Sequence, residues 1–218
     1  MAENLLLSPN LPTHPLPPST SPTESDYIRT TTQNYVSRSA LLLNPSNVRI
    51  KGKTIVQPNV TIHGDYGAPI HIGRYCSIDE GTVISPTLVP SSSDPLAIHA
   101  GESSSPGGPP SPHEKALPLQ IGSHTQIGSN TVIQSLSIGS FVRIGSNCIL
   151  SPRSKVYDCC VVEDGTVVPP DMIVPPFSRV RGNPGRIVGR LPECCGGEFV
   201  EACANDYGMF VRKLEVKK

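Results

Sequence analysis

The sequence contains no tryptophan, and aromatic residues make up only 5% of its 218 residues. A core of packed rings is therefore excluded, and we expect a core of aliphatic side chains. No apolar run is long enough to cross a bilayer, and the N-terminus has no basic stretch ahead of an apolar one. The sequence therefore predicts a soluble, non-secreted protein.

An excess of charge of either sign is also missing. The chain carries 18 basic and 18 acidic residues, so it has no overall field that would attract nucleic acid or an anionic membrane. We therefore expect neither a nucleic-acid partner nor direct insertion into a membrane.

What the sequence does have is a regular beat between Leu119 and Val180. An aliphatic residue returns at every sixth position, with one five-residue step, at Ile121, Ile127, Ile133, Ile138, Ile144, Leu150, Val156, Val162, Val168, Val174 and Val180. This period matches neither an α-helix nor a half-buried strand. It is typical of hexapeptide repeats in a parallel β-helix, in which three repeats form one coil. The sequence thus predicts an all-β fold, a left-handed parallel β-helix of about five coils.

The beat also sets the organisation of the chain. It starts at Ile50, passes a ten-residue step after Ile62, and is interrupted after Ile84 by a segment rich in Pro, Ser and Gly. We predict a disordered Pro/Ser-rich arm at 1–25, the β-helix at 26–190 with an inserted loop at 85–118, and a C-terminal helical segment at 191–218. Residues 26–47 are expected to cap the first coil, and Gly208 to interrupt or weaken the C-terminal helix.

Two further positions of the repeat have a recognisable composition. The third residue after each aliphatic is often one that tolerates a left-handed backbone, such as Asn59, Gly81 or Asn130, which predicts a tight corner there. The fourth is small, and includes Cys76, Cys148 and Cys160. Because the seven cysteines contain no Cys-x-x-Cys pair, we interpret them as reduced thiols of a cytosolic protein.

Zinc chemistry of the kind found in carbonic anhydrases of the gamma class, which share this fold, requires three converging histidines. The chain resembles that family around Gly64-Asp65 and in the coils from Ile121 to Ile144. The three positions that the resemblance assigns to the ligands hold Ser85, Ser129 and Gln134. The six histidines are His14, His63, His71, His99, His113 and His124. We therefore predict no metal site.

An acyltransferase is the alternative that the sequence leaves open. The segment from Val180 to Arg186 (VRGNPGR) is similar to the ending of many hexapeptide acyltransferases. That resemblance implies a trimeric, acetyl-CoA-dependent enzyme with a histidine as general base, for which His99 and His113 in the insertion are the candidates. Near the second coil, His63 and Asp65 are placed to pair, and Asp65 is alternatively placed to bind Arg74 or to fix its own turn.

A more specific resemblance lies in the strings that flank the repeats. They are YIRTTTQN from Tyr27, VSR from Val36, KGKTI from Lys51, IHGD from Ile62, IGR from Ile72, VVPP from Val167, VPPF from Val174 and LPEC from Leu191. Over about residues 26–210 these strings are similar to the dynactin subunit 5 family. The resemblance implies a non-catalytic subunit of the dynactin pointed-end complex, which helps to link cytoplasmic dynein to cargo such as early endosomes.

The same resemblance implies the partners and the location. Membership implies contacts with dynactin subunit 6, with the pointed-end actin-related protein and with dynactin subunit 4, and indirect contacts with dynein and cargo adaptors. It also implies a cytoplasmic protein associated with the cytoskeleton. We accordingly predict that the chain has no catalytic, cofactor-binding or metal-binding residues and needs no cofactor.

Overall fold

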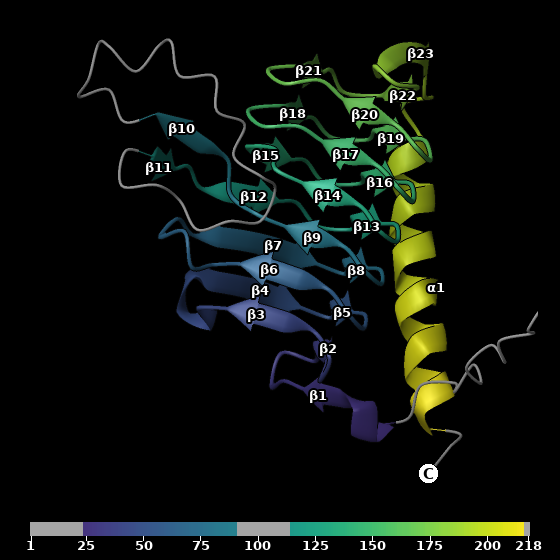
Figure 1. The fold of residues 1–218 in the computed structure, drawn as a ribbon. Coiled ribbons are helices and arrows are strands. Elements are labelled where there is room, and N and C mark those ends of the chain that lie inside the picture. Colours follow the sequence, from purple (N-terminus) through teal and green to yellow (C-terminus); the bar gives the residue numbers. More distant parts are fainter. Residues whose placement is uncertain (1–23, 91–113, 216–218) are drawn as a thin grey trace, which may run out of the picture.

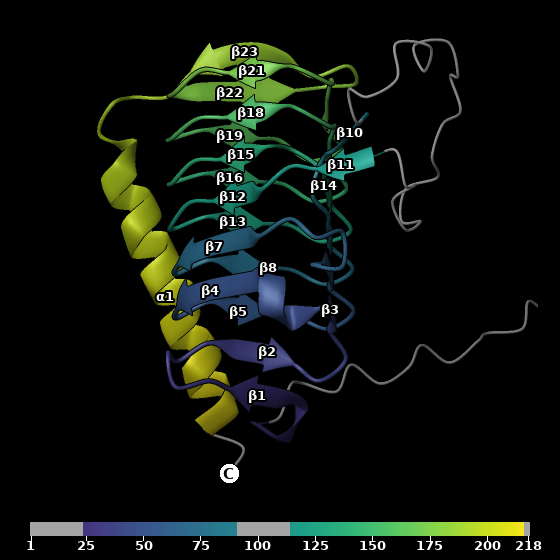
Figure 2. The same cartoon turned by 90° about the vertical axis from the view of Figure 1, so that its left-hand side faces the viewer.

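The computed structural model describes residues 24–90 and 114–215. Their strands wind into a three-sided prism, and one long helix, α1 (Cys195–Glu215), lies along the outside of it (Figure 1). The view turned by 90° shows the coils stacked on one another with α1 running across nearly all of them (Figure 2). The predicted β-helix is confirmed, and the six-residue repeat explains how its strands are arranged.

Each side of the prism is one sheet. Sheet A contains β1 (Tyr27–Arg29), β2 (Tyr35–Ser37), β5 (Ile55–Val56), β8 (Ser77–Ile78), β13 (Gln126–Ile127), β16 (Arg143–Ile144), β19 (Val161–Val162), β22 (Ser178–Arg181) and β23 (Arg186–Arg190), in that order. Sheet B contains β3 (Leu41–Leu43), β6 (Thr61–His63), β9 (Val83–Ile84), β14 (Val132–Ile133), β17 (Ile149–Leu150) and β20 (Val167–Val168). Sheet C contains β4 (Val48–Gly52), β7 (Ile70–Arg74), β12 (Leu119–Ile121), β15 (Ser137–Ile138), β18 (Lys155–Val156) and β21 (Ile173–Val174). Short 3-10 turns, η1 (Glu24–Asp26) and η2 (Pro45–Asn47), precede β1 and β4.

The prism has six complete coils, because sheets B and C hold six strands each. The additional coil is formed by residues that we expected to act only as a cap. Val36 and Leu42 continue the six-residue beat, and η2 lengthens the next step to Ile50, which hides the repeat in the sequence. Strand β1 pairs antiparallel with β2, and Phe210 and Leu214 of α1 pack against both strands at this end.

The interior is a stack of the beat residues in register. Ile78, Ile127, Ile144, Val162 and Val180 pair from coil to coil along sheet A, and all are at most 2% exposed. The small residues at the fourth position are buried with them, including Thr125, Thr131, Cys76 and Cys148. The hydroxyl and thiol groups of these four residues donate to backbone carbonyls of an adjacent coil, whereas the Thr166 hydroxyl, at the same position of its repeat, is buried without a hydrogen-bond partner.

The predicted left-handed corners are confirmed at Asn59, Gly81 and Asn130, whereas Asp65 and Asn183, at the same position of their repeats, have no positive φ. Positive φ angles occur three residues after the inward aliphatics, for example at Asn59 (58°), Gly81 (71°) and Asn147 (57°). Bulky residues occupy the same conformation at Tyr75 (54°) and Phe141 (58°), where the next coil supplies stacking partners.

The insertion leaves the prism at the corner between sheets B and C. Its two ends form an antiparallel ribbon of β10 (Leu88–Pro90) and β11 (Glu114–Ala116). Because β12 pairs with β7 below it and β15 above it, the coil closes across the insertion. The central part of the predicted loop and most of the predicted N-terminal arm lie outside the described residues, so those domain boundaries remain predictions.

Helix α1 is continuous through Gly208, which corrects the expected interruption. The Cβ that alanine would add at Gly208 meets nothing within 4 Å, so the glycine fills no packing role there. Cys195, Cys203, Phe210 and Leu214 are buried on one face of the helix, where Phe210 and Leu214 pack with Tyr27, Tyr35 and Ile55. Tertiary packing therefore outweighs the low helix propensity of one glycine. Within the described segments, no helix combines the length and the apolar character needed to span a bilayer.

Candidate functional site

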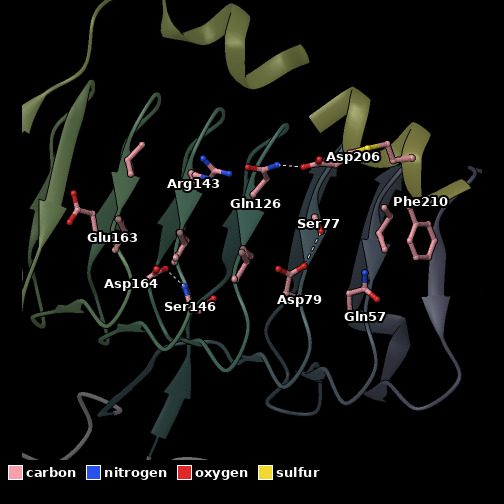
Figure 3. A pocket seen from close by; sticks show the side chains of 18 of the residues that line it. Gln57, Ser77, Asp79, Gln126, Arg143, Ser146, Glu163, Asp164, Asp206 and Phe210 are labelled. Carbon is pink, nitrogen blue, oxygen red and sulfur yellow. Dashed lines mark hydrogen bonds between the residues drawn. The ribbon is translucent and has the colours of Figure 1, made fainter. Parts of the chain in front are cut away.

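A long groove of about 860 Å³ lies between sheet A and α1 (Figure 3). Its floor follows from the repeat: the residues on either side of each inward aliphatic point outward. The beat therefore lines up Ser77, Gln126, Arg143, Val161 and Arg179 along one column of the sheet. Helix α1 supplies the wall through Asp206, Met209, Phe210 and Lys213.

The middle of the groove is tied to the helix by one polar contact. The side-chain amide of Gln126 in β13 donates a hydrogen bond to the carboxylate of Asp206 in α1. Asp79 follows β8, the strand that precedes β13 in sheet A, and it accepts a hydrogen bond of 3.2 Å from the Ser77 hydroxyl. Burial raises the pKa of the Asp79 carboxyl, the Ser77 hydrogen bond opposes that rise, and the negative charge of Asp206 adds to it. This half of the groove is therefore acidic.

The other half is lined by cations around one carboxylate. Glu163 forms ion pairs with Arg179 and with Arg181, the latter over 3.3 Å. Arg143, on the neighbouring strand β16, also lines the groove, with its guanidinium turned toward Gln126 (Figure 3). Asp164 is held at the corner, where it accepts a hydrogen bond of 2.8 Å from the backbone N–H of Ser146. The groove thus has the carboxylates of Asp79 and Asp206 in one half and the ion pairs of Glu163 in the other, and most of the outward side chains on its floor are polar.

An aromatic stack stabilises the corner beside the helix. The His124 ring lies between Tyr75 and Phe141, with ring centroids 5.3 Å away on both sides. Tyr207 of α1 meets Tyr75 edge to face at 6.0 Å, and its hydroxyl donates a 2.8 Å hydrogen bond to the Gln33 carbonyl. Burial lowers the pKa of His124, so the stack favours the neutral imidazole. His124 itself occupies a left-handed corner, with a φ of 55°.

The cysteines are structural within this arrangement. All seven are unpaired, and only Cys194 is exposed. Burial raises the pKa of the Cys76 thiol to about 11 and that of Cys203 to about 12. Cys159, whose pKa is raised to about 11 by burial and by the neighbouring Cys195, lies where α1 starts. Thiols with raised pKa values are poor nucleophiles, so none of these three suits covalent catalysis.

The positions considered for zinc lie in the coils but carry no ligand. Ser85 is buried after β9, Ser129 lies at a corner after β13, and the backbone carbonyl of Gln134 accepts a hydrogen bond from the Thr87 hydroxyl. Among residues 24–90 and 114–215 no group of three His, Cys, Asp or Glu side chains is placed to hold a metal ion.

The histidines considered for acyl transfer fall in a part of the sequence that the structure does not describe. His99 and His113, like His14, lie outside the described residues. His63 Nδ1 lies 3.3 Å from Asp65 Oδ1, so of the pairings considered for Asp65 the one with His63 is present. The His63 ring is largely buried and stacks on Tyr66 at 5.1 Å. This cluster faces sheet B and is remote from the groove, which is lined by sheet A and α1.

Sequence reasoning did not single out Asp79, Gln126, Arg143 or Asp206. The two strand residues, Gln126 and Arg143, could have been found from their place in the repeat. Each directly precedes an inward aliphatic, and the same sheet is reached again every three repeats, as at Arg143, Val161 and Arg179. The position of Asp206 depends on how the helix packs, which no local pattern contains.

The chain is similar in structure to a protein of known structure and in sequence to a dynactin subunit 5. The structure is similar to PerB from Caulobacter crescentus, solved in complex with CoA and GDP-perosamine, with a TM-score of 0.50 and 19% identity over 72% of this chain and 57% of PerB. At that identity the likeness establishes a shared fold. A dynactin subunit 5 from Dictyostelium discoideum is 45% identical over 64 residues, which are 29% of this chain. The chain thus spans about a third (32%) of that relative.

The model of the family described as dynactin subunit 5 matches residues 111–216. This stretch includes the second half of the prism, the LPEC string and α1. Both comparisons therefore point to the family suggested by the flanking strings: residues 111–216 match the dynactin subunit 5 family model, and a 64-residue stretch is similar to a curated member of that family.

Proposed function

We propose that this chain is a non-catalytic subunit of the dynactin pointed-end complex, where it helps to link cytoplasmic dynein to cargo such as early endosomes. The observation that carries the proposal is the family match over residues 111–216. In this role the protein is cytoplasmic and associated with the cytoskeleton. Its direct partners are dynactin subunit 6, the pointed-end actin-related protein and dynactin subunit 4, and it needs no cofactor.

The groove supports a docking role. Its floor carries mostly polar outward side chains with Val161 among them, and Met209 of α1 is 51% exposed at its wall. The ion pairs of Glu163 and the contact between Gln126 and Asp206 keep most of its charged groups engaged within the chain. Such a surface suits shape-based contact with another subunit, in which a buried apolar centre is surrounded by a polar rim.

Co-purification tests the proposal. The full chain is co-expressed with dynactin subunit 6 and analysed by size exclusion, and a tagged form is used to precipitate dynactin from cell extract. We expect a shared elution peak and recovery of the pointed-end subunits. Absence of both would refute the assignment. Saturable acetyl-CoA binding in a calorimeter, with turnover lost on His99→Ala or His113→Ala, would favour the acyltransferase alternative.

A matched pair of variants tests the groove itself. Met209→Glu places a carboxylate at the groove wall, whereas Val200→Glu changes another exposed apolar residue of α1 that does not line the groove. We expect the first variant to weaken association with the other dynactin subunits about tenfold and the second to leave it unchanged. Equal effects of the two variants would mean that the groove is not the contact surface.

A further inference from the structure

The first coil of the prism is open at its free end. Its inward residues Val36, Leu42 and Ile50 are only partly buried, although they continue the stacks of the core. At the other end, Val174 and Val180 have no exposed surface at all. The coil at the N-terminal end therefore has the composition of an interior layer, and within residues 24–90 and 114–215 no further coil covers it.

The free edge is protected over sheet A and sheet C but not over sheet B. Strand β1 covers β2, and the outward side chains of β4 include the exposed cations Arg49 and Lys51. Strand β3 ends its sheet and consists of three leucines, of which Leu41 is 53% exposed. A flat apolar edge strand without charge, proline or bulge is the kind that accepts another strand.

The hydrogen bonds of β3 leave one residue facing the open side. The Leu41 N–H donates to the Val60 carbonyl (2.8 Å), and the Leu43 carbonyl accepts from the Gly64 N–H (3.0 Å), so both residues bond to the second coil. Because consecutive residues of a strand direct their backbone groups to opposite sides, the N–H and C=O of Leu42 point away from the prism. Another strand laid along β3 meets both a donor and an acceptor.

Exposed cations lie on the sheet C side of this edge, whereas the acidic turn η1 lies on its sheet A side, where the Asp26 carbonyl accepts a hydrogen bond from the Arg38 N–H. Residues 35–53, which form the first coil, contain Arg38, Arg49, Lys51 and Lys53 and no Asp or Glu. Arg49 and Lys51 are exposed, while Arg38 and Lys53 donate hydrogen bonds to the Ser25 carbonyl and the Tyr75 hydroxyl. An occupant with carboxylates is therefore favoured over one with basic side chains.

We propose that β3 is an acceptor site for an extended segment of a partner protein in which apolar residues alternate with Asp or Glu. The segment adds to sheet B as a strand next to Leu41–Leu43, hydrogen-bonds to Leu42, and places its carboxylates near Arg49 and Lys51. This inference goes beyond the proposed function, because it concerns a different surface and does not depend on which complex the chain joins.

The test uses three labelled eight-residue peptides and the full chain, with binding followed by fluorescence anisotropy. The first alternates valine and glutamate, the second alternates valine and lysine, and the third is the first with its alternate backbone nitrogens methylated. We expect saturable binding of the first, roughly tenfold weaker binding of the second because of charge repulsion, and no binding of the third. Equal binding of all three, or no binding of the first, would overturn the proposal.

Two variants locate the site on the chain. Leu41→Glu places a carboxylate at the proposed edge, and Ile149→Glu makes the same change at an exposed outward position of the same sheet, in the fifth coil. We expect Leu41→Glu to weaken peptide binding about tenfold and Ile149→Glu to leave it unchanged. A dimer in sedimentation that only Leu41→Glu dissociates would instead assign the edge to a second copy. Because neither experiment involves a dynactin subunit, failure here leaves co-elution with subunit 6 as a separate question.

Discussion

The C-terminal and N-terminal ends of the prism are formed by the same repeat but are terminated differently. At the C-terminal end, β23 folds back antiparallel onto β22, and the last coil carries two pairs of prolines, Pro169-Pro170 and Pro175-Pro176. The outer strand β23 has an arginine at each end, and its pairing with β22 has an irregular register. At the N-terminal end, β1 covers one side of three, and β3 remains an apolar edge.

The difference shows that capping a β-helix is a separate task from extending it. A coil that ends without a cap exposes backbone donors and acceptors as well as apolar side chains, and both promote association. The C-terminal end avoids this through charge, proline and a bulge. The N-terminal end relies on η1, β1 and the last turns of α1, which together cover sheet A only.

The largest effect is expected from removing the aromatic contact that covers the N-terminal end. Phe210 is 8% exposed and meets Tyr27 at 5.0 Å and Tyr35 at 5.6 Å, edge to face in both cases. Phe210→Ala should lower the free energy of unfolding by about 3 kcal/mol in a urea titration, because it leaves a cavity between α1 and β1. Val200→Ala, at an exposed position of the same helix, should change it by less than about 0.5 kcal/mol. A small effect of Phe210→Ala would mean that α1 does not hold this end together.

A slightly smaller effect is expected from crowding the close approach between coils. A Cβ at Gly73 would lie 2.5 Å from the backbone carbonyl carbon of Gly122, whereas one at Gly189, near the C-terminal end, meets nothing within 4 Å. Gly73→Ala should therefore lower the free energy of unfolding by about 2–3 kcal/mol and Gly189→Ala should leave it nearly unchanged. Thermal unfolding followed by circular dichroism distinguishes the two. If Gly73→Ala and Gly189→Ala have similar melting temperatures, Gly73 and Gly122 are not in close contact in solution.

A third pair of variants compares the two ends directly. Val36 in the first coil and Val180 after the last complete coil both point inward from sheet A, but only Val180 is fully buried. Val180→Ala should cost about 2 kcal/mol of unfolding free energy and Val36→Ala about 1 kcal/mol, because the second site loses less buried area. If the costs in urea titrations are equal, the N-terminal end is covered in solution.

The smallest effect is a pH dependence confined to the N-terminal end. The Tyr27 hydroxyl donates a 2.7 Å hydrogen bond to Gln57, and burial, followed by the charges of Asp26 and Glu80, raises its pKa to about 12. Since the folded chain holds this proton more tightly than the unfolded chain, the contribution is present below pH 10 and is lost as the pH rises toward 12. Stability should therefore fall on going from pH 9 to pH 11.

Tyr27→Phe isolates this contribution from the cysteines that titrate in the same range. The variant lacks the ionisable hydroxyl, so its melting temperature should fall less between pH 9 and pH 11 than that of the unmodified chain. Parallel decreases in the two proteins would show that Tyr27 is not responsible.

The regular part of the fold was predictable because each repeat determines its own conformation. The inward residues from Ile121 to Val180, the corner conformation of Asn130 and the burial of Cys148 all follow from position within six residues. The first coil was not predicted, because η2 adds two residues between Leu42 and Ile50 and thereby interrupts the six-residue period. The continuity of α1 through Gly208 was not predicted, because it depends on tertiary packing and not on local helix propensity.

The groove was less predictable than the fold. Its floor is implicit in the outward positions of sheet A, but the choice of that sheet depends on where α1 packs. The helix is anchored there by Tyr207, Phe210 and Leu214 against residues near the N-terminus, and the separation between Tyr207 and Gln33 is 174 positions. Contacts of such separation leave no local pattern. This is also why Asp206 could not be paired with Gln126 from the sequence.

The ribbon of β10 and β11 has a consequence for how the chain tolerates change. Leu88 pairs with Ala116, and Pro90 pairs with Glu114. This pairing fixes the two ends of the insertion next to each other before the interrupted coil resumes at β12. The entropy of closing a loop grows only slowly with its length, by roughly 0.6 kcal/mol for each doubling. The segment between the two strands is therefore a position at which residues can be added or removed at little thermodynamic cost. An engineer seeking a place for a fluorescent protein or an affinity tag would choose this ribbon.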